Sequence, residues 1–209
     1  MKVLKFGGTS VGSVESIRQI QHIISQQTDD CVVVVSALGG ITDQLLHAAQ
    51  LALQAEDTYL EVYQTIRQRH LDMANSLIDN VTTRQMLCHE LENILDELRS
   101  ILFGVHLVKD LSAKSEAVIV SYGEQLSSRI VAAALPGAVR KDSLQFIRTD
   151  RKQGQVLLDT ELTESLVRQT FAPIPHLTVC AGFISRDSQT DEITNLGRGG
   201  SDYTASILA

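Results

Sequence analysis

The sequence has 209 residues, of which 44% are hydrophobic, enough to bury a sizeable core in one large domain or one and a half. A net charge of −7 without a basic stripe excludes a nucleic-acid binder, which needs cations to replace the counterions along a phosphate backbone. No apolar run approaches the roughly 20 residues of a membrane span, and no secretory signal precedes the first strand. The cysteines Cys31, Cys88 and Cys180 lie far apart, without a metal-binding spacing. We therefore expect a soluble cytoplasmic protein with reduced thiols and no membrane partner.

The first predicted strand, Val3–Phe6, runs directly into Gly-Gly-Thr-Ser, and a helix is predicted from Val14 to Gln27 with Ser13 as its N-cap. A strand, a glycine turn and a helix N-terminus offer backbone N–H groups to an anion, and Lys5 would add a full positive charge. The order differs from a Walker A loop, and the spacing differs from the dinucleotide fingerprint. A tight turn with a solvent-facing lysine fits these residues equally well.

The next strand, Cys31–Val35, is almost entirely β-branched, as is typical of a strand covered on both faces. It ends in a second glycine turn, residues 36–42, in which Thr42 is the expected N-cap of the following helix. Residues 56–110 contain no strand pattern, and their apolar side chains recur at helical spacing. We expect a helical hairpin there, inserted into an α/β scaffold.

The remaining elements alternate, which favours α/β layering around a mainly parallel sheet. A helix is predicted over Ser115–Leu135, and another over Thr160–Thr170. Strands are predicted over Val139–Thr149 and Leu177–Ile184. The polar segment Ser185–Asn195 suits an exposed β-hairpin or a loose loop.

The sequence ends in a third glycine turn, residues 197–202, followed by a helix that begins at Ser201. The turn is a second candidate anion site, with Arg198 beside it. No glycine, basic last turn or proline terminates the helix after Leu208. From this we expect the chain to be a fragment of a longer protein.

Glycines at strand ends are mostly turns, but several at the carboxyl ends of parallel strands indicate a ligand site. Gly123 is predicted to interrupt its helix and to let a ligand approach the backbone near Glu124. By itself Glu124 is more readily explained as a solvated helix residue, and Arg148 at a strand end as a surface cation.

Five blocks taken together identify a family. In order, they are Lys5–Val11 (KFGGTSV), residues 35–42 (VSALGGIT), Ser121–Glu124 (SYGE), Arg148–Asp150 (RTD) and Leu196–Ala205 (LGRGGSDYTA). This set resembles the aspartate kinases (aspartokinases) of the amino acid kinase family and covers nearly the whole chain. The resemblance implies a three-layer αβα sandwich with a mainly parallel sheet, here truncated. It also implies ATP with Mg²⁺ and phosphorylation of the L-aspartate side-chain carboxylate, the first step towards lysine, threonine and methionine.

The resemblance also implies roles for individual residues. The catalytic residues are Lys5 and Asp202, the latter orienting the lysine cluster. The substrate-binding residues are Ser36, Thr42, Glu124 for the α-ammonium and Arg148 for the α-carboxylate. The phosphate-binding residues are Lys5, Gly7, Gly8, Thr9, Ser10, Gly199, Gly200 and Ser201. The protein is expected to supply no metal site, with Mg²⁺ held mainly by ATP. Because a carboxylate nucleophile is already ionised at neutral pH, no general base is needed.

The family's adenine-binding segment, second phosphate-binding lysine and regulatory modules are not found in this sequence. Residues 1–209 are therefore expected to form the aspartate-binding portion of the kinase domain and to be inactive alone, with homo-oligomers formed by the full-length protein. Whether that protein is monofunctional or fused to homoserine dehydrogenase stays open. Another amino acid kinase, such as glutamate 5-kinase or acetylglutamate kinase, is a weaker alternative. A binding or assembly module without turnover is the non-enzymatic one.

Overall fold

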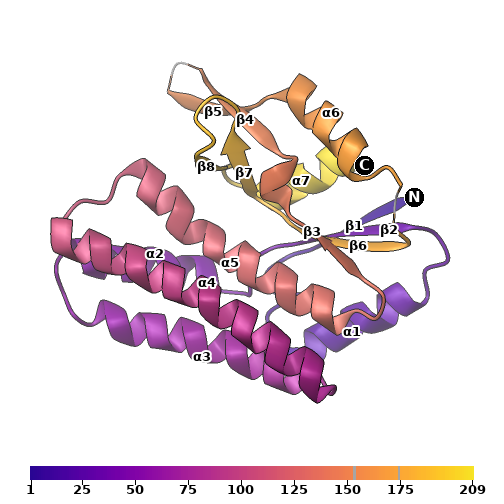
Figure 1. The fold of residues 1–209 in the computed structure, drawn as a ribbon, viewed down its shortest axis with the longest axis horizontal. Coiled ribbons are helices and arrows are strands. Elements are labelled where there is room, and N and C mark those ends of the chain that lie inside the picture. Colours follow the sequence, from indigo (N-terminus) through magenta and orange to yellow (C-terminus); the bar gives the residue numbers. More distant parts are fainter. Residues whose placement is uncertain (153, 174) are drawn as a thin grey trace.

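The computed structural model describes residues 1–152, 154–173 and 175–209. At its centre is sheet A, whose strands all pair in parallel. The order across sheet A is β1 (Lys2–Phe6), β2 (Cys31–Val35), β6 (Leu177–Ala181) and β3 (Val139–Lys141). Helices cover the sheet, so the predicted α/β class with a mainly parallel sheet is confirmed (Figure 1).

Strand β2 is buried on both faces, as its β-branched run predicted. Because successive side chains point to opposite faces of a strand, Val33 and Val35 enter the large core on one side of sheet A. On the other side, Val32 and Val34 pack with Phe146 and its neighbours in a second core. Sheet A is thus the middle layer of the molecule.

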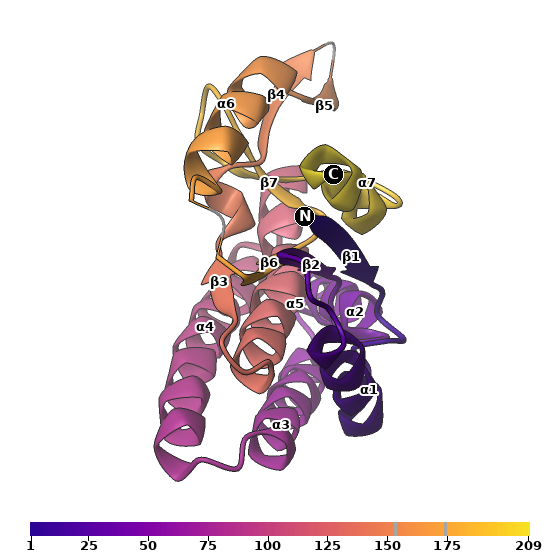
Figure 2. The same ribbon diagram turned by 90° about the vertical axis from the view of Figure 1, so that its right-hand side faces the viewer.

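The large core is covered by two tiers of helices. The first tier consists of α1 (Val14–Ser25), α2 (Ile41–Leu53) and α5 (Ala113–Ala134). The second is the predicted helical hairpin, α3 (Tyr59–Leu77) and α4 (Val81–Val108), which packs on α2 and α5 away from the sheet (Figures 1 and 2). The apolar residues of α4 that recur at helical spacing are buried there, among them Leu91 and Leu98.

The opposite face of sheet A carries α6 (Thr160–Thr170) and α7 (Gly200–Leu208). Beside them lies sheet B, with the order β5 (Gln155–Leu158), β4 (Arg148–Lys152), β7 (Ile184–Asp187) and β8 (Ile193–Asn195). Helix α7 packs against β1 and β2, which brings the two chain ends close together (Figure 2).

Two predicted strands are wrong because each is broken. The predicted strand over residues 139–149 divides into β3, a single 3-10 turn at Ser143–Gln145, and β4. The Asp142 carboxylate accepts the Leu144 N–H, and the Ser143 hydroxyl donates to the Ala181 carbonyl, which together stabilise that turn. The strand predicted over residues 177–184 breaks at Phe183, whose φ is 67°, where the chain passes from sheet A to sheet B.

The helix N-termini are of two kinds. Ser13 caps α1 as predicted, and its side chain accepts the N–H of Ser16. Thr42, however, is not the cap of α2, because the helix already begins at Ile41 after Gly40, with φ of 80°. A glycine has no side chain to cap a helix, so no side chain occupies the first-turn N–H groups of α2, of which that of Ile41 donates to the Leu38 carbonyl at 2.9 Å. Of the helices that the structure describes, none is both long and apolar enough to span a bilayer.

Candidate active site

Three parallel strands of sheet A end at the same edge. Their last residues lie in register, Phe6 beside Val35 and Val35 beside Ala181. Hydrogen bonds extend the pairing by one residue, from Ser36 N–H to the Phe6 carbonyl at 3.1 Å and from Gly182 N–H to the Val35 carbonyl at 2.8 Å. The glycine turns that follow β1 and β2 therefore lie next to Gly182, which follows β6. This is the edge at which open α/β sheets bind ligands.

Helix α7 docks on this edge by its N-terminus. The hydroxyl of Thr204 accepts the Phe183 N–H at 3.0 Å, and Ser36 Oγ donates to Ser201 Oγ at 2.9 Å. A Cβ on Gly182 would lie 2.7 Å from the Ser201 Cβ, so only glycine allows the helix to approach so closely. The cap residue of α7 is Gly199, with φ of 75°, which leaves the first-turn N–H groups facing the strand ends.

A cavity of about 280 Å³ lies between the strand ends and α7. It is lined by Lys5, Ser36, Thr42, Glu124, Phe183, Gly197, Arg198, Gly199, Gly200, Ser201 and Asp202. Eight of the predicted site residues therefore share one pocket, although they come from four separate blocks of the sequence. The size is near the lower end of the range of small-molecule pockets, about 300 Å³ upward.

The other predicted phosphate-binding residues lie beside the cavity and do not line it. A Cβ on Gly7 would be 3.4 Å from the Lys5 ammonium, so the glycine leaves that side chain room. Gly8 contacts the second glycine turn, and its carbonyl accepts the Gly39 N–H at 2.9 Å. Thr9 and Ser10 are exposed on the outer side of the first turn.

Lys5 projects from the end of β1 into the pocket. Its ammonium lies 3.0 Å from the Asp202 carboxylate, which belongs to the first turn of α7. The lysine side chain is 26% exposed, whereas that of Asp202 is 70% exposed. An ion pair with such an accessible partner is weak, so an anionic ligand can exchange for Asp202 at the lysine.

Glu124 is buried, so the alternative reading of this residue as a solvated helix side chain is wrong. Burial raises the pKa of its carboxyl to about 7, while a hydrogen bond from the Ala37 backbone lowers it less. The second carboxylate oxygen, Oε2, has no partner among the residues that the structure describes. A buried and half-satisfied carboxylate in a pocket indicates a missing cationic or hydrogen-bonding ligand.

Gly123 does not interrupt α5, and no gap beside it admits a ligand. A Cβ at this position would lie 2.8 Å from the Ala37 Cβ, so the glycine brings α5 against the second turn instead. Ser127 strengthens the same contact, because its hydroxyl donates to the Ser36 carbonyl at 2.7 Å. This close packing is what carries Glu124 into the pocket.

The burial of Glu124 predicts a pH-dependent stability. A carboxyl with a raised pKa stabilises the fold below its ordinary pKa of 4.5, and this contribution is lost as the pH rises through about 7. We expect the unfolding free energy of the wild type, relative to Glu124→Gln, to fall by about 3 kcal/mol as the pH rises from 4.5 to about 7, at up to roughly 1.4 kcal/mol per pH unit, and to stay level above that. Urea unfolding at several pH values measures this difference, and parallel curves for both proteins would contradict it.

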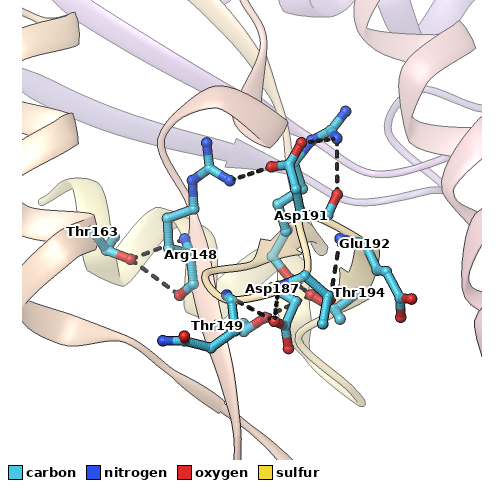
Figure 3. A network of polar contacts seen from close by, with 11 residues as sticks. Arg148, Thr149, Thr163, Asp187, Asp191, Glu192 and Thr194 are labelled. Carbon is cyan, nitrogen blue, oxygen red and sulfur yellow. Dashed lines mark hydrogen bonds and ion pairs between the residues drawn. The ribbon is translucent and has the colours of Figure 1, made fainter.

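Arg148 does not line the pocket, and its guanidinium points instead towards Asp191 (Figure 3). The arginine stands at the start of β4, and its guanidinium bonds to the Asp191 carboxylate at 2.8 Å. Asp191 also pairs with Arg186 at 2.9 Å. The backbone N–H and carbonyl of Arg148 are both bonded to the hydroxyl of Thr163. Arg148 thus joins β4 and α6 to the turn between β7 and β8.

The β-hairpin predicted over residues 185–195 is confirmed by the antiparallel pairing of β7 and β8, but its polar side chains are not simply exposed. Asp187 is buried, and the N–H groups of Thr190 and Gln189 hold the pKa of its carboxyl below the usual range (Figure 3). The hydroxyl of Thr194 is bonded to that of Thr149 at 2.6 Å. These bonds fix the hairpin from which the third glycine turn departs.

Arg198 lines the pocket in the place where Arg148 was expected. It lies between Gly197 and Gly199, both with φ of 75°, just ahead of α7. The sequence signal was present, because this arginine is flanked by glycines at a helix start. The sequence pattern predicts only that Arg198 lies beside an anion site, and it does not indicate that Arg198 lines the same pocket as Glu124.

The whole chain, residues 1–209, matches the family model described as the amino acid kinase family. The chain belongs to the amino acid kinase family. Within this family, it is 30% identical to aspartokinase 1, chloroplastic, of Arabidopsis thaliana, over 99% of this chain and 37% of that protein. It is 31% identical to the aspartokinase of Chlamydia trachomatis, over 99% of this chain and 45% of that protein.

The fold agrees with solved members of the amino acid kinase family. The structure of E. coli aspartokinase III in complex with aspartate and ADP superposes with a TM-score of 0.87 at 28% identity. That match covers 99% of this chain and 46% of the E. coli chain. The resemblance to aspartokinases is therefore confirmed, and this chain spans less than half the length of these relatives.

Proposed function

We propose that this chain is the aspartate-binding portion of an aspartate kinase, which transfers the γ-phosphoryl group of ATP to the side-chain carboxylate of L-aspartate. The product, 4-phospho-L-aspartate, would enter lysine, threonine and methionine biosynthesis. The observation that carries the proposal is a single pocket that combines the buried carboxylate of Glu124 with the cations Lys5 and Arg198. The E. coli relative, whose structure is described as a complex with aspartate and ADP, supports it.

The pocket offers one partner for each charge of an α-amino acid. Glu124 takes the α-ammonium, which satisfies the carboxylate oxygen left without a partner. Arg198 takes the α-carboxylate as a two-pronged donor, the role that the family resemblance implied for Arg148. The hydroxyls of Ser36 and Thr42 orient the side-chain carboxylate of the substrate.

Phosphoryl transfer then depends on positioning and charge. The aspartate side chain is ionised at neutral pH, so this chain supplies no general base. Lys5 neutralises the charge on the transferring group, and Asp202 orients the lysine towards the pocket until the anion takes its place. The Ser201 N–H in the first turn of α7 would face the same anion, whereas the Gly200 N–H donates to the Gly197 carbonyl at 3.0 Å.

The site fits a phosphate group, because a lysine with a replaceable partner and an uncapped helix N-terminus both meet the cavity. ATP with Mg²⁺ would supply the phosphoryl group. No cluster of three metal-binding side chains occurs among the described residues, and Mg²⁺ coordination mainly by ATP stays a prediction. The first glycine turn, with Gly7, Gly8, Thr9 and Ser10, would approach the phosphates from the side of β1.

The remaining parts of the proposal concern the complete protein. Residues 1–209 are taken as one portion of a kinase domain, with the helical insert at about residues 56–110 and the nucleotide-binding and regulatory parts supplied elsewhere. Homo-oligomers of the complete protein and a cytoplasmic location stay predictions as well. The coverage of 37% to 46% of the aspartokinase relatives supports this division.

Calorimetry and a hydroxamate assay on the 209-residue chain test the proposal. We expect the chain to bind L-aspartate, to bind glutamate and N-acetylglutamate more weakly, and to form no aspartyl hydroxamate by itself. A complete kinase that contains this chain should form it. Hydroxamate made by the pure 209-residue chain, but not by Lys5→Ala, would contradict the division. Tighter binding of N-acetylglutamate than of aspartate would favour a different amino acid kinase.

A further inference from the structure

Arg69 on α3 reaches from the helical insert to the two glycine turns of the site. Its guanidinium donates to the Gly39 carbonyl at 2.7 Å and to the Gly12 carbonyl at 3.2 Å. Gly12 ends the turn after β1, and Gly39 lies in the turn after β2. The side chain is half-buried, so its planar fork is held against both peptide groups.

The two turns meet through backbone atoms. Gly39 N–H donates to the Gly8 carbonyl at 2.9 Å. A Cβ on Gly8 would lie 3.2 Å from the Ala37 carbonyl oxygen, and one on Gly39 would lie 3.1 Å from the Gly8 carbonyl oxygen. Glycines at these two positions let the turns come together, but they provide no side chains to hold them there. Arg69 supplies a side chain that binds both turns.

These turns adjoin groups of the pocket that come from different strands. Lys5 lies just before the first turn, whereas Ser36 begins the second turn. The second turn also contains Ala37, whose backbone hydrogen bond reaches Glu124. A change in the distance between the turns therefore moves the lysine relative to the substrate-binding groups.

We propose that Arg69 is a positioning residue, which fixes the turn that follows Lys5 and β1 against the turn that begins with Ser36. Its catalytic consequence rests on the proposed aspartate kinase function, but its structural action does not. Through Arg69 the α3–α4 hairpin becomes part of the site's support, although it lies in the outer tier of helices (Figure 2). A lysine at this position could reach one carbonyl but not both as a planar fork.

Amide hydrogen exchange of the 209-residue chain, followed by NMR at Gly39, tests the structural action. We expect Arg69→Met to accelerate exchange of this amide at least about tenfold, since losing a charged donor loosens the turn. Arg69→Lys should fall between Arg69→Met and the wild type. The matched control is Arg67→Met on the same helix, which removes the ion pair with Glu92 on α4 without touching either turn.

Exchange rates are compared after correction for the global stability of each variant. Equal acceleration at Gly39 in Arg67→Met and Arg69→Met would overturn the proposal, because α3 would then act only through general stability. An unchanged exchange rate of the Gly39 amide in Arg69→Met would also overturn the proposal. Neither result depends on whether the protein is a kinase.

A complete kinase that contains this chain gives the catalytic readout. We expect Arg69→Met to lower kcat about tenfold or more and to change KM for aspartate less than about threefold, because the proposed contacts of Glu124 and Arg198 remain. An increase in KM as large as the loss in kcat would overturn the positioning role. If the wild-type protein shows no aspartate kinase activity, the proposed function fails, and the exchange experiment still decides the role of Arg69.

Discussion

In a complete kinase that contains this chain, Lys5→Ala is expected to lower kcat about 10³-fold while aspartate still binds. The Lys5 ammonium lies at the end of β1, within 3.0 Å of an exposed carboxylate that an anion can replace. A charge directed at the transferring phosphoryl group stabilises mainly the transition state, so its loss lowers kcat and barely changes ground-state binding of the amino acid.

Steady-state kinetics together with calorimetric aspartate binding measure the two effects separately. Lys2→Ala is the matched control, since Lys2 lies on the same strand but pairs with Asp29 at the opposite end of sheet A. Near-normal turnover in Lys5→Ala, or loss of aspartate binding with turnover intact at saturation, would remove the lysine from its proposed role.

Local patterns in the sequence predicted most of the elements, because their causes are local. The β-branched run Cys31–Val35 forms the doubly buried strand, and the helical recurrence of Leu91 and Leu98 forms the insert. Ser13 caps α1 through its own side chain, a contact that spans only three residues. Each of these features depends on periodicity or on a neighbouring residue, so no tertiary information was needed.

The predictions that failed depend on contacts between distant segments. Arg148 was placed at the carboxyl end of a long strand, but that strand breaks and the arginine begins β4 of sheet B instead. The burial of Glu124 follows from the packing of Gly123 against Ala37, more than 80 residues away in sequence. Helical spacing alone does not indicate which polar residue of α5 faces that turn.

The second large effect is expected at Arg198, the arginine that we propose binds the substrate. In the complete kinase, Arg198→Lys is expected to raise KM for aspartate about tenfold or more, since lysine keeps the charge but loses the two-pronged geometry. Arg198 is exposed and lines the cavity, so the loss should lie near the lower end for a charged pair. KM for ATP should change much less, because this side chain is assigned to the amino acid.

Arg148→Lys is the matched control, because it makes the same chemical change 50 positions earlier, in the ion pair with Asp191. We expect near-normal KM for aspartate in this variant.

Succinate inhibition separates the contacts further, since succinate keeps a carboxylate for Arg198 but has no ammonium for Glu124. Arg198→Lys should therefore weaken both ligands, and Glu124→Gln should weaken aspartate alone. If Arg148→Lys raised KM and Arg198→Lys did not, Arg148 would have to reach the substrate by breaking its bond to Asp191, and the pocket described here would not be the aspartate site.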